Sequence, residues 1–114
     1  MKGISTHVLD MVHGKPAKDM SVRLEKQDAR GDWRPLASAR TGQDGRCARL
    51  LPEGEDVSAG VYRLIFDTAS YYGAQKVDAL HTVVEVTFRV REGEAHFHIP
   101  LLLTPNGYTT YRGS

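Results

Sequence analysis

The side chains of this sequence best suited to chemistry are histidines near its two ends. His96 and His98 stand two residues apart just before an apolar run, so a regular strand would place both imidazoles on one face. Imidazole has a pKa close to neutral pH, which suits a general base or acid. The same spacing occurs in metal sites, with His7 as a third ligand, and it also fits surface histidines without a role. Since no carboxylate or cysteine accompanies the pair, we expect two oriented imidazoles in an active site and no bound metal.

Three further candidates accompany the pair. His7 lies in the middle of a predicted strand, where a histidine taken alone is more often hydrogen-bonded and structural. Arg46 follows a glycine in a turn; most such arginines are solvated, but one turned inward offers a planar fork for an anionic or carbonyl-rich ligand. The chain ends in Tyr111-Arg112-Gly113-Ser114 after a strand-like segment, so we expect a sheet to hold this terminus. No serine-nucleophile elbow, phosphate loop or dinucleotide-binding glycine pattern is present.

The elements that would position these groups are short strands. Alternating polar and apolar residues predict strands over residues 4–9, 21–26, 33–41, 61–66, 83–90, 96–104 and 107–114, with a further short strand over residues 47–51. The one plausible helix runs from Ser70 to Val77, with Asp67, Thr68 or Ser70 as its N-cap. Residues 10–19 are expected to form a loop. This pattern predicts an all-β fold, a two-sheet β-sandwich of seven to eight strands with one short helix.

The strand over residues 96–104 has two different faces. Its apolar face is predicted to lie in the core and carries Phe97, Ile99, Leu101 and Leu103. The imidazoles therefore project away from the core, toward water or a second subunit. Pro35 indicates that residues 33–41 form an edge strand. The first and last strands could both lie near sheet edges, and because unpaired edges invite association, we expect an oligomer.

Length and composition restrict the classes of protein that fit. The 114 residues suit one domain spanning residues 1–114, and the net charge of +1 gives no reason to expect nucleic acid or an anionic membrane as a partner. The longest apolar run near the tail is about five residues, against the roughly 20 that a membrane span needs. The first residues contain no apolar stretch typical of a secretory signal. Cys47 is the only cysteine, so we expect a packed thiol, no intrachain disulfide and a cytoplasmic location.

Motifs along essentially the whole chain resemble the transthyretin-related 5-hydroxyisourate hydrolase family. The tail from His96 to Ser114 resembles that family's C-terminal signature, including a YRGS ending that the transthyretin hormone carriers lack. Residues 5–10 and 14–17, STHVLD and GKPA, look like its first motif. Residues 41–46, TGQDGR, are similar to its Arg-bearing turn. Residues 79–85 depart from the pattern, since the family usually has an aromatic-aromatic-Pro-Glu segment there.

The resemblance implies a fold, an assembly and a set of site residues. The fold would have two four-stranded sheets and one short helix, and a homotetramer would carry its active sites in the channel where two dimers meet. Carried over by motif, the implied catalytic residues are His7, Arg46, His98 and Ser114. The implied substrate-binding residues are His7, Arg46, His96, Tyr111 and Arg112. The resemblance implies no cofactor, metal, nucleic acid or membrane partner.

The implied reaction is hydrolysis of 5-hydroxyisourate to 2-oxo-4-hydroxy-4-carboxy-5-ureidoimidazoline in purine breakdown. Water attacks a cyclic amide carbonyl and must lose a proton as it does so. We expect His7 or His98 to act on this water, and Arg46 to hold urate-like oxygens, stabilise negative charge and keep nearby imidazoles neutral. Two other classes stay open, a carrier that binds an aromatic ligand in the central channel and a purely structural sandwich. A carrier would not need His7, Arg46 and the YRGS ending together.

The implied tail poses a geometric problem. On an unbroken strand, Tyr111 and Ser114 would point to opposite faces. Both can reach one site only if the strand twists or breaks near Gly113, or if one of them acts through its backbone.

Overall fold

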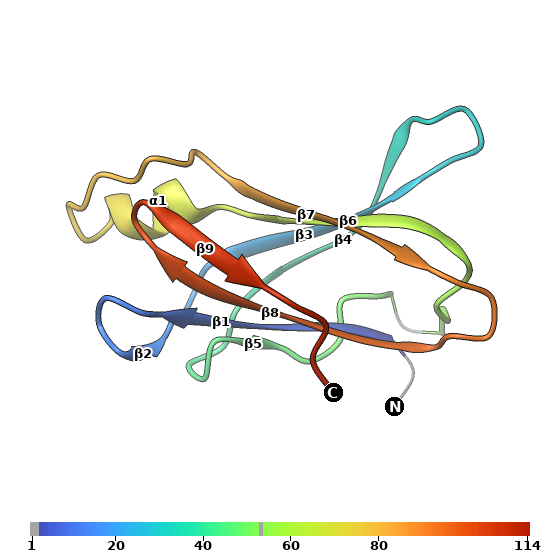
Figure 1. The fold of residues 1–114 in the computed structure, drawn as a ribbon, viewed down its shortest axis with the longest axis horizontal. Helices are drawn as coiled ribbons and strands as arrows, with labels where there is room; N and C mark the ends of the chain where they lie inside the picture. Colours follow the sequence, from blue (N-terminus) through green and yellow to red (C-terminus); the bar gives the residue numbers. More distant parts are fainter. Residues whose placement is uncertain (1–2, 53) are drawn as a thin grey trace.

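The chain folds into two β-sheets packed face to face, with a short helix at one end (Figure 1). A computed structural model describes residues 3–52 and 54–114, so Met1, Lys2 and Glu53 lie outside the described residues. The described elements, in chain order, are β1 (Gly3–Asp10), β2 (Lys15–Pro16), β3 (Ser21–Gln27), β4 (Trp33–Arg40), β5 (Arg46–Cys47), β6 (Gly60–Phe66), α1 (Thr68–Gly73), β7 (Val84–Val90), β8 (His96–Thr104) and β9 (Gly107–Thr110). The predicted all-β sandwich is confirmed, with two of its strands only two residues long.

The order of the strands brings the two ends of the chain together. One sheet has the order β2-β1-β8-β9, with β5 also paired to β1, and the other has the order β4-β3-β6-β7. Strands β1 and β8 pair in parallel, with Ser5 opposite His98 and His7 opposite Pro100. The other pairings between the described strands are antiparallel. The parallel pair therefore places the N-terminal histidine next to the C-terminal pair.

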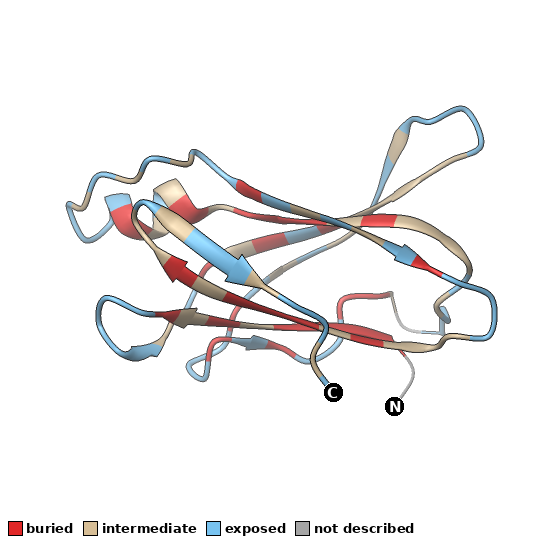
Figure 2. Cartoon of the chain, viewed as in Figure 1, coloured by how far each residue is buried: buried red, intermediate tan, exposed pale blue. Residues whose placement is uncertain are grey.

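The core lies between the two sheets and follows the predicted alternation (Figure 2). On β8 the predicted row of Phe97, Ile99, Leu101 and Leu103 is buried, and Pro100 on the opposite face is buried as well. The facing sheet contributes Val22, Leu24, Tyr62, Leu64 and Phe66 from β3 and β6. Complete burial of an aliphatic or aromatic side chain contributes roughly 1.5–3 kcal/mol, so these two rows are the main source of stability. Cys47 is also buried in this core, as predicted, and burial followed by the nearby Asp44 raises the pKa of its thiol.

Helix α1 is shorter than predicted and begins two residues earlier, at Thr68. Asp67 is its N-cap, one of three predicted, and the carboxylate accepts a hydrogen bond from the Ser70 amide at 3.3 Å. The helix ends at Gly73, and the chain turns away at Lys76, which has a φ of 60°, while the Val77 amide donates to the Tyr72 carbonyl at 3.0 Å. In this kind of turn after a helix, the residue with positive φ is usually a glycine. Because lysine occupies this position here, the sequence carries no signal for the end of the helix.

Two other expectations were wrong. The predicted loop over residues 10–19 contains β2, which pairs with the end of β1. The predicted strand over residues 47–51 is replaced by β5, because Leu50 and Leu51 turn into the core. Strand β1 lies next to an edge, with only the two short strands beyond it, and β9 is an edge strand, so both lie near sheet edges as expected. Strand β4 is an edge strand, as Pro35 predicts.

Candidate active site

Three of the predicted site residues lie together on the outer face of the β1 sheet. His7 on β1 pairs with Arg46 on β5, and Ser5 on the same strand pairs with His98 on β8. Residues paired across neighbouring strands project from the same face, as do residues two apart on one strand. The opposite face carries buried core residues such as Thr6 and Val8. His7, Arg46 and His98 therefore share the face that is turned away from the second sheet.

The His98 imidazole is half-buried and held by the neighbouring strand. Its Nδ1 lies 2.8 Å from the Ser5 hydroxyl oxygen, and Ser5 is itself 5% exposed. Burial, followed by the positive charge of Arg46 and the nearby His7 and His96, lowers the pKa of His98 below its usual value. A lowered pKa means that His98 is neutral at physiological pH, with Nε2 left to interact with a water or substrate.

The turn before β5 holds His7 and Arg46 in place. His7 Nε2 donates to the Asp44 carbonyl at 2.8 Å, which leaves Nδ1 of the neutral ring as an acceptor. The Asp44 carboxylate accepts a hydrogen bond from the Arg46 amide at 3.0 Å but lies 3.9 Å from the Arg46 guanidinium. The guanidinium is half-exposed and only loosely paired, so its donors can reach an anionic or carbonyl oxygen.

The tail packs its backbone against His98. Strand β9 ends at Thr110, before the predicted end of the strand, and Gly113 then forms an isolated bridge to His98. The Gly113 amide donates to the His98 carbonyl at 2.7 Å. A Cβ on Gly113 would lie 2.8 Å from the Cδ2 atom of His98, so only glycine fits there without movement. The strand therefore breaks near Gly113, and Ser114 follows directly from the residue that touches His98.

The other predicted binding residues have different surroundings. Arg112 donates to Glu94 at 2.8 Å and to the His96 carbonyl at 3.1 Å, and its guanidinium lies 4.1 Å from the centroid of the Phe97 ring. Tyr111 is 55% exposed and lines a small groove with Phe97 at the open edge between the sheets. The structure therefore brings neither side chain next to His7, and their contact with substrate stays a prediction.

His96 lies on the same face as His98, as the spacing predicts, and contributes to lowering the His98 pKa. Its Nδ1 atom is buried and has no hydrogen-bond partner among residues 3–52 and 54–114. Within the same residues, no group of three or more histidine, cysteine or carboxylate side chains is placed to hold a metal ion. No helix of the described chain is long and apolar enough to cross a membrane.

Sequence reasoning missed two contributors to this site. Ser5 could have been found, because it stands two residues before His7 and therefore on the same strand face. The Asp44 carbonyl could not, because its role depends on the conformation of a turn. A break near Gly113 was among the expectations, but its bridge to His98 joins distant segments and has no local signal.

Comparison with known proteins assigns the chain to a family. Residues 4–113 match the model of the HIUase/Transthyretin family. The chain belongs to this family. The resemblance inferred from the motifs is thus confirmed, over nearly the whole length of the chain.

Two named relatives and two solved structures illustrate the range of similarity. The 5-hydroxyisourate hydrolase of Ralstonia nicotianae is 42% identical over 118 residues, covering 100% of both chains. The mouse 5-hydroxyisourate hydrolase is 40% identical over 112 residues, covering 97% of this chain and 94% of its own. The structure of Klebsiella pneumoniae 5-hydroxyisourate hydrolase has a TM-score of 0.86 at 33% identity, covering 100% of both chains. Sea bream transthyretin in complex with thyroxine has a TM-score of 0.89 at 35% identity, covering 96% of this chain and 93% of its own.

Proposed function

We propose that the protein hydrolyses 5-hydroxyisourate to 2-oxo-4-hydroxy-4-carboxy-5-ureidoimidazoline. The observation that carries the proposal is the meeting of His7, Arg46 and His98 on one sheet face, with the chain terminus packed on His98. The curated relatives above are named 5-hydroxyisourate hydrolase, and they match this chain over almost its full length. The reaction needs a base for water and positive charge for the developing oxyanion, and this face offers both.

In the proposed mechanism the two imidazoles share the handling of water. His98, kept neutral by its surroundings, accepts a proton at Nε2 as the water attacks the cyclic amide carbonyl, and it gives this proton to the ring nitrogen that leaves as the C–N bond breaks. His7 orients the water or the substrate through Nδ1, since its Nε2 is held by the Asp44 carbonyl. Arg46 binds the urate-like oxygens and stabilises the negative charge on the carbonyl oxygen. No cofactor or metal takes part in this scheme.

Ser5 acts in this scheme as a positioning residue for His98. A hydroxyl can donate to Nδ1 or accept from it, so it can hold the ring in one orientation whether Nε2 is free or protonated. A carboxylate in its place would favour the imidazolium and raise the pKa of His98. The buried serine therefore orients the base and leaves its pKa low.

The tail would complete the substrate site. Ser114, through its hydroxyl, would hydrogen-bond near the reacting ring, since the preceding Gly113 touches His98. Tyr111, Arg112 and His96 are the further residues that we propose to contact substrate. For Arg112 this would require release from Glu94, to which it donates at 2.8 Å.

We also propose that the site is completed in a homotetramer in the cytoplasm, with active sites where two dimers meet. The outer face around His7 carries the partly exposed Leu9 and Leu102, an apolar border that a second subunit could cover. Strands β7 and β9 are edges of their described sheets and are open to pairing.

A carrier function is the second candidate, and one observation favours it. The likeness to sea bream transthyretin in complex with thyroxine is as close as the likeness to the Klebsiella hydrolase, so shape alone does not separate the two activities. The imidazole, guanidinium and hydroxyl groups on the sheet face favour the hydrolase, because binding an aromatic ligand does not need a base.

The test is to generate 5-hydroxyisourate from urate with urate oxidase and to follow its decay by absorbance. Wild-type protein should accelerate the decay. His7→Ala and His98→Ala should each lower kcat/KM by about 10²- to 10⁴-fold, the usual contribution of a general base. The matched control is His81→Ala, which removes an imidazole that packs on Tyr108 instead. If the wild type does not accelerate the decay, the hydrolase proposal is wrong and the carrier function stays. If activity survives both site substitutions, the proposed site is wrong.

A further inference from the structure

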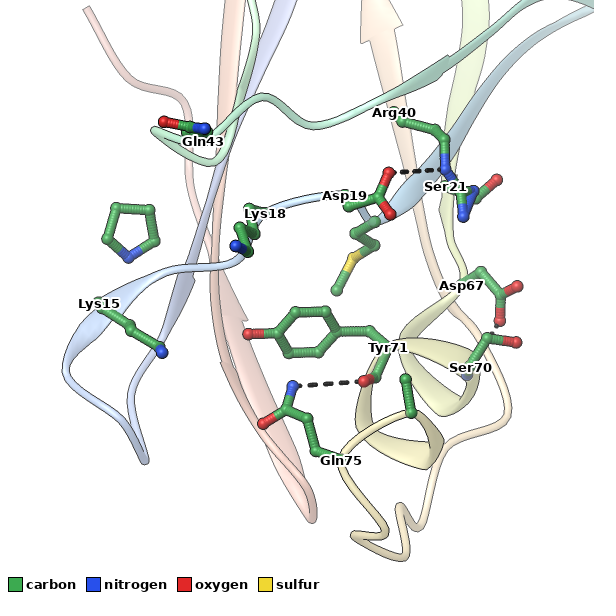
Figure 3. Close-up of a pocket in the computed structure, with 13 residues that line it drawn as sticks. Lys15, Lys18, Asp19, Ser21, Arg40, Gln43, Asp67, Ser70, Tyr71 and Gln75 are labelled. Carbon is green, nitrogen blue, oxygen red and sulfur yellow. Dashed lines mark hydrogen bonds and ion pairs between the residues drawn. The ribbon is translucent and has the colours of Figure 1, made fainter.

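A second concave region lies away from the imidazoles, and we call it the helix-side pocket. It is enclosed by helix α1, the β2 segment and the end of β4, and it has a volume of about 720 Å³ (Figure 3). Small-molecule sites usually have volumes of roughly 300–1,000 Å³. The groove beside Tyr111, at about 240 Å³, is below that range. The helix-side pocket thus has the size of a small-molecule site, and the proposed hydrolysis makes no use of it.

The walls of this pocket are held by hydrogen bonds that need no ligand. Arg40 donates from Nε to Asp19 at 2.9 Å across one end. The Met20 amide donates to the Thr41 hydroxyl at 2.8 Å, and the Thr41 amide donates to the Met20 carbonyl at 2.9 Å. These bonds order part of the pocket wall before a ligand binds, which lowers the conformational entropy lost on binding at those residues.

Tyr71 lies at the centre of the pocket, and a hydrogen bond to a buried residue holds its side chain in place. Its hydroxyl donates to the buried Asp10 carboxylate at 2.8 Å. Burial and this carboxylate raise the pKa of Tyr71 to about 12, so the hydroxyl stays protonated and keeps the ring in place. Pro16 also lines the pocket, and it is partly exposed, whereas Met20 is 1% exposed and lies behind the wall. A flat organic group could pack on the surface of Tyr71 and Pro16.

The unpaired charge of the pocket is positive. Its two carboxylates are both engaged, Asp19 with Arg40 and Asp67 as the helix cap. Lys15 and Lys18 make no side-chain hydrogen bond or ion pair within residues 3–52 and 54–114. Figure 3 shows both lysines on the side of the pocket toward which the Tyr71 hydroxyl points. A ligand with an anionic group at that end would meet two ammonium groups.

We propose that the helix-side pocket binds a small planar organic anion. Lys15 and Lys18 bind its carboxylate or similar group, and the surface of Tyr71 and Pro16 contacts its flat body. The site lies beside the candidate active site and does not overlap it. Gln43 lines the pocket, whereas the next residue, Asp44, turns its carbonyl to His7.

The experiment uses the full chain and follows backbone amide shifts by NMR during titration. The probe is benzoate, which combines a flat ring with a carboxylate. Benzamide keeps the ring without the charge, and inorganic phosphate keeps a charge without the ring. Benzoate should give saturable shifts at Lys15, Lys18 and Tyr71, with a Kd of about 1 mM. Both comparison probes should bind at least about tenfold more weakly, because each lacks one of the two contacts.

Paired variants test the assignment. Lys15→Gln combined with Lys18→Gln should weaken benzoate binding by at least about tenfold, the effect of losing charge-assisted hydrogen bonds. The matched control combines Arg30→Gln with Arg34→Gln, which removes the same charge from exposed positions outside the pocket. His98→Ala should bind benzoate as the wild type does, so failure of the proposed hydrolysis would leave this result unaffected. No saturable shift, shifts centred on His7 and His98, or equal weakening by both double variants would overturn the proposal.

Discussion

The two faces of strand β8 differ in composition, because one is an apolar row and the other combines two histidines with Pro100 and Leu102. Toward the second sheet, Phe97, Ile99, Leu101 and Leu103 are at most 5% exposed and fill the core. On the other face, His96 and His98 stay partly exposed beside His7 and Arg46. The same ladder of hydrogen bonds to β1 supports both faces. Substitutions on the inner face should therefore change stability, and those on the outer face should change chemistry.

Leu101→Ala on the inner face should give the largest effect. Leu101 is completely buried, so its truncation removes apolar burial and leaves a cavity. We expect the free energy of unfolding to fall by about 2–5 kcal/mol, measured by urea denaturation. The kcat/KM of the folded fraction should stay at the wild-type value. A large loss of kcat/KM with unchanged stability would show that the two faces are not separate.

Removal of Arg112 to Ser114 should give the next largest effect, on the outer face. We expect kcat/KM for 5-hydroxyisourate to fall at least tenfold, about 1.4 kcal/mol of transition-state stabilisation. Gly113→Ala isolates the packing on His98, because it retains Arg112 and Ser114 but places a Cβ 2.8 Å from the imidazole. Gly73→Ala is its control, since nothing lies within 4 Å of the added atom. Near-wild-type activity of the truncated chain would exclude a role for the tail.

Ser5→Ala should have a smaller effect that separates positioning from folding. Loss of one hydrogen bond to His98 is worth roughly 0.5–1.5 kcal/mol, so kcat should fall by about two- to tenfold with little change in KM. Ser5→Thr keeps the hydroxyl and should restore most of kcat. Ser38→Ala, at an exposed position on β4, serves as the control. If kcat falls only in proportion to the folded fraction, Ser5 is structural and does not position the base.

Arg46→Gln tests how the outer face controls the pKa of His98, which can be measured by NMR titration. Removing the positive charge should raise this pKa, because Arg46 is second only to burial in lowering it. Arg46→Lys keeps the charge and should leave the pKa low. An unchanged His98 pKa in Arg46→Gln would contradict the proposed electrostatic link between the two residues.

The same lowered pKa has a consequence for stability. Unfolding returns His98 to its ordinary pKa of about 6.5, so the unfolded chain takes up a proton at this residue first as the pH falls. The contribution of His98 to stability is therefore complete above about pH 6.5 and is lost at lower pH. Urea denaturation of wild type and His98→Ala at pH 7.5 and 5.5 should show a smaller loss of stability in the variant. An equal loss in both chains would show that His98 is not the group responsible.

Local signals predicted the parts of the fold that depend on neighbouring residues. Alternation identified the buried row of β8, Pro35 identified an edge strand, and Asp67 was among the three predicted helix caps. The end of α1 could not be predicted, because Lys76 occupies a position that usually signals itself by a glycine. The parallel pairing of β1 with β8 also has no local signal, since its partners lie at opposite ends of the chain.

The sequence by itself determined which side chains share a strand face and which family the chain resembles. Its period of two assigns His96 and His98 to one face and Phe97 and Ile99 to the other, whatever the partner strand is. Only the tertiary structure decided that Ser5 meets His98, that His7 meets Arg46, and that the backbone of Gly113 packs against an imidazole. The physical reason is that alternation is a property of one strand, whereas register results from the packing of the whole sandwich.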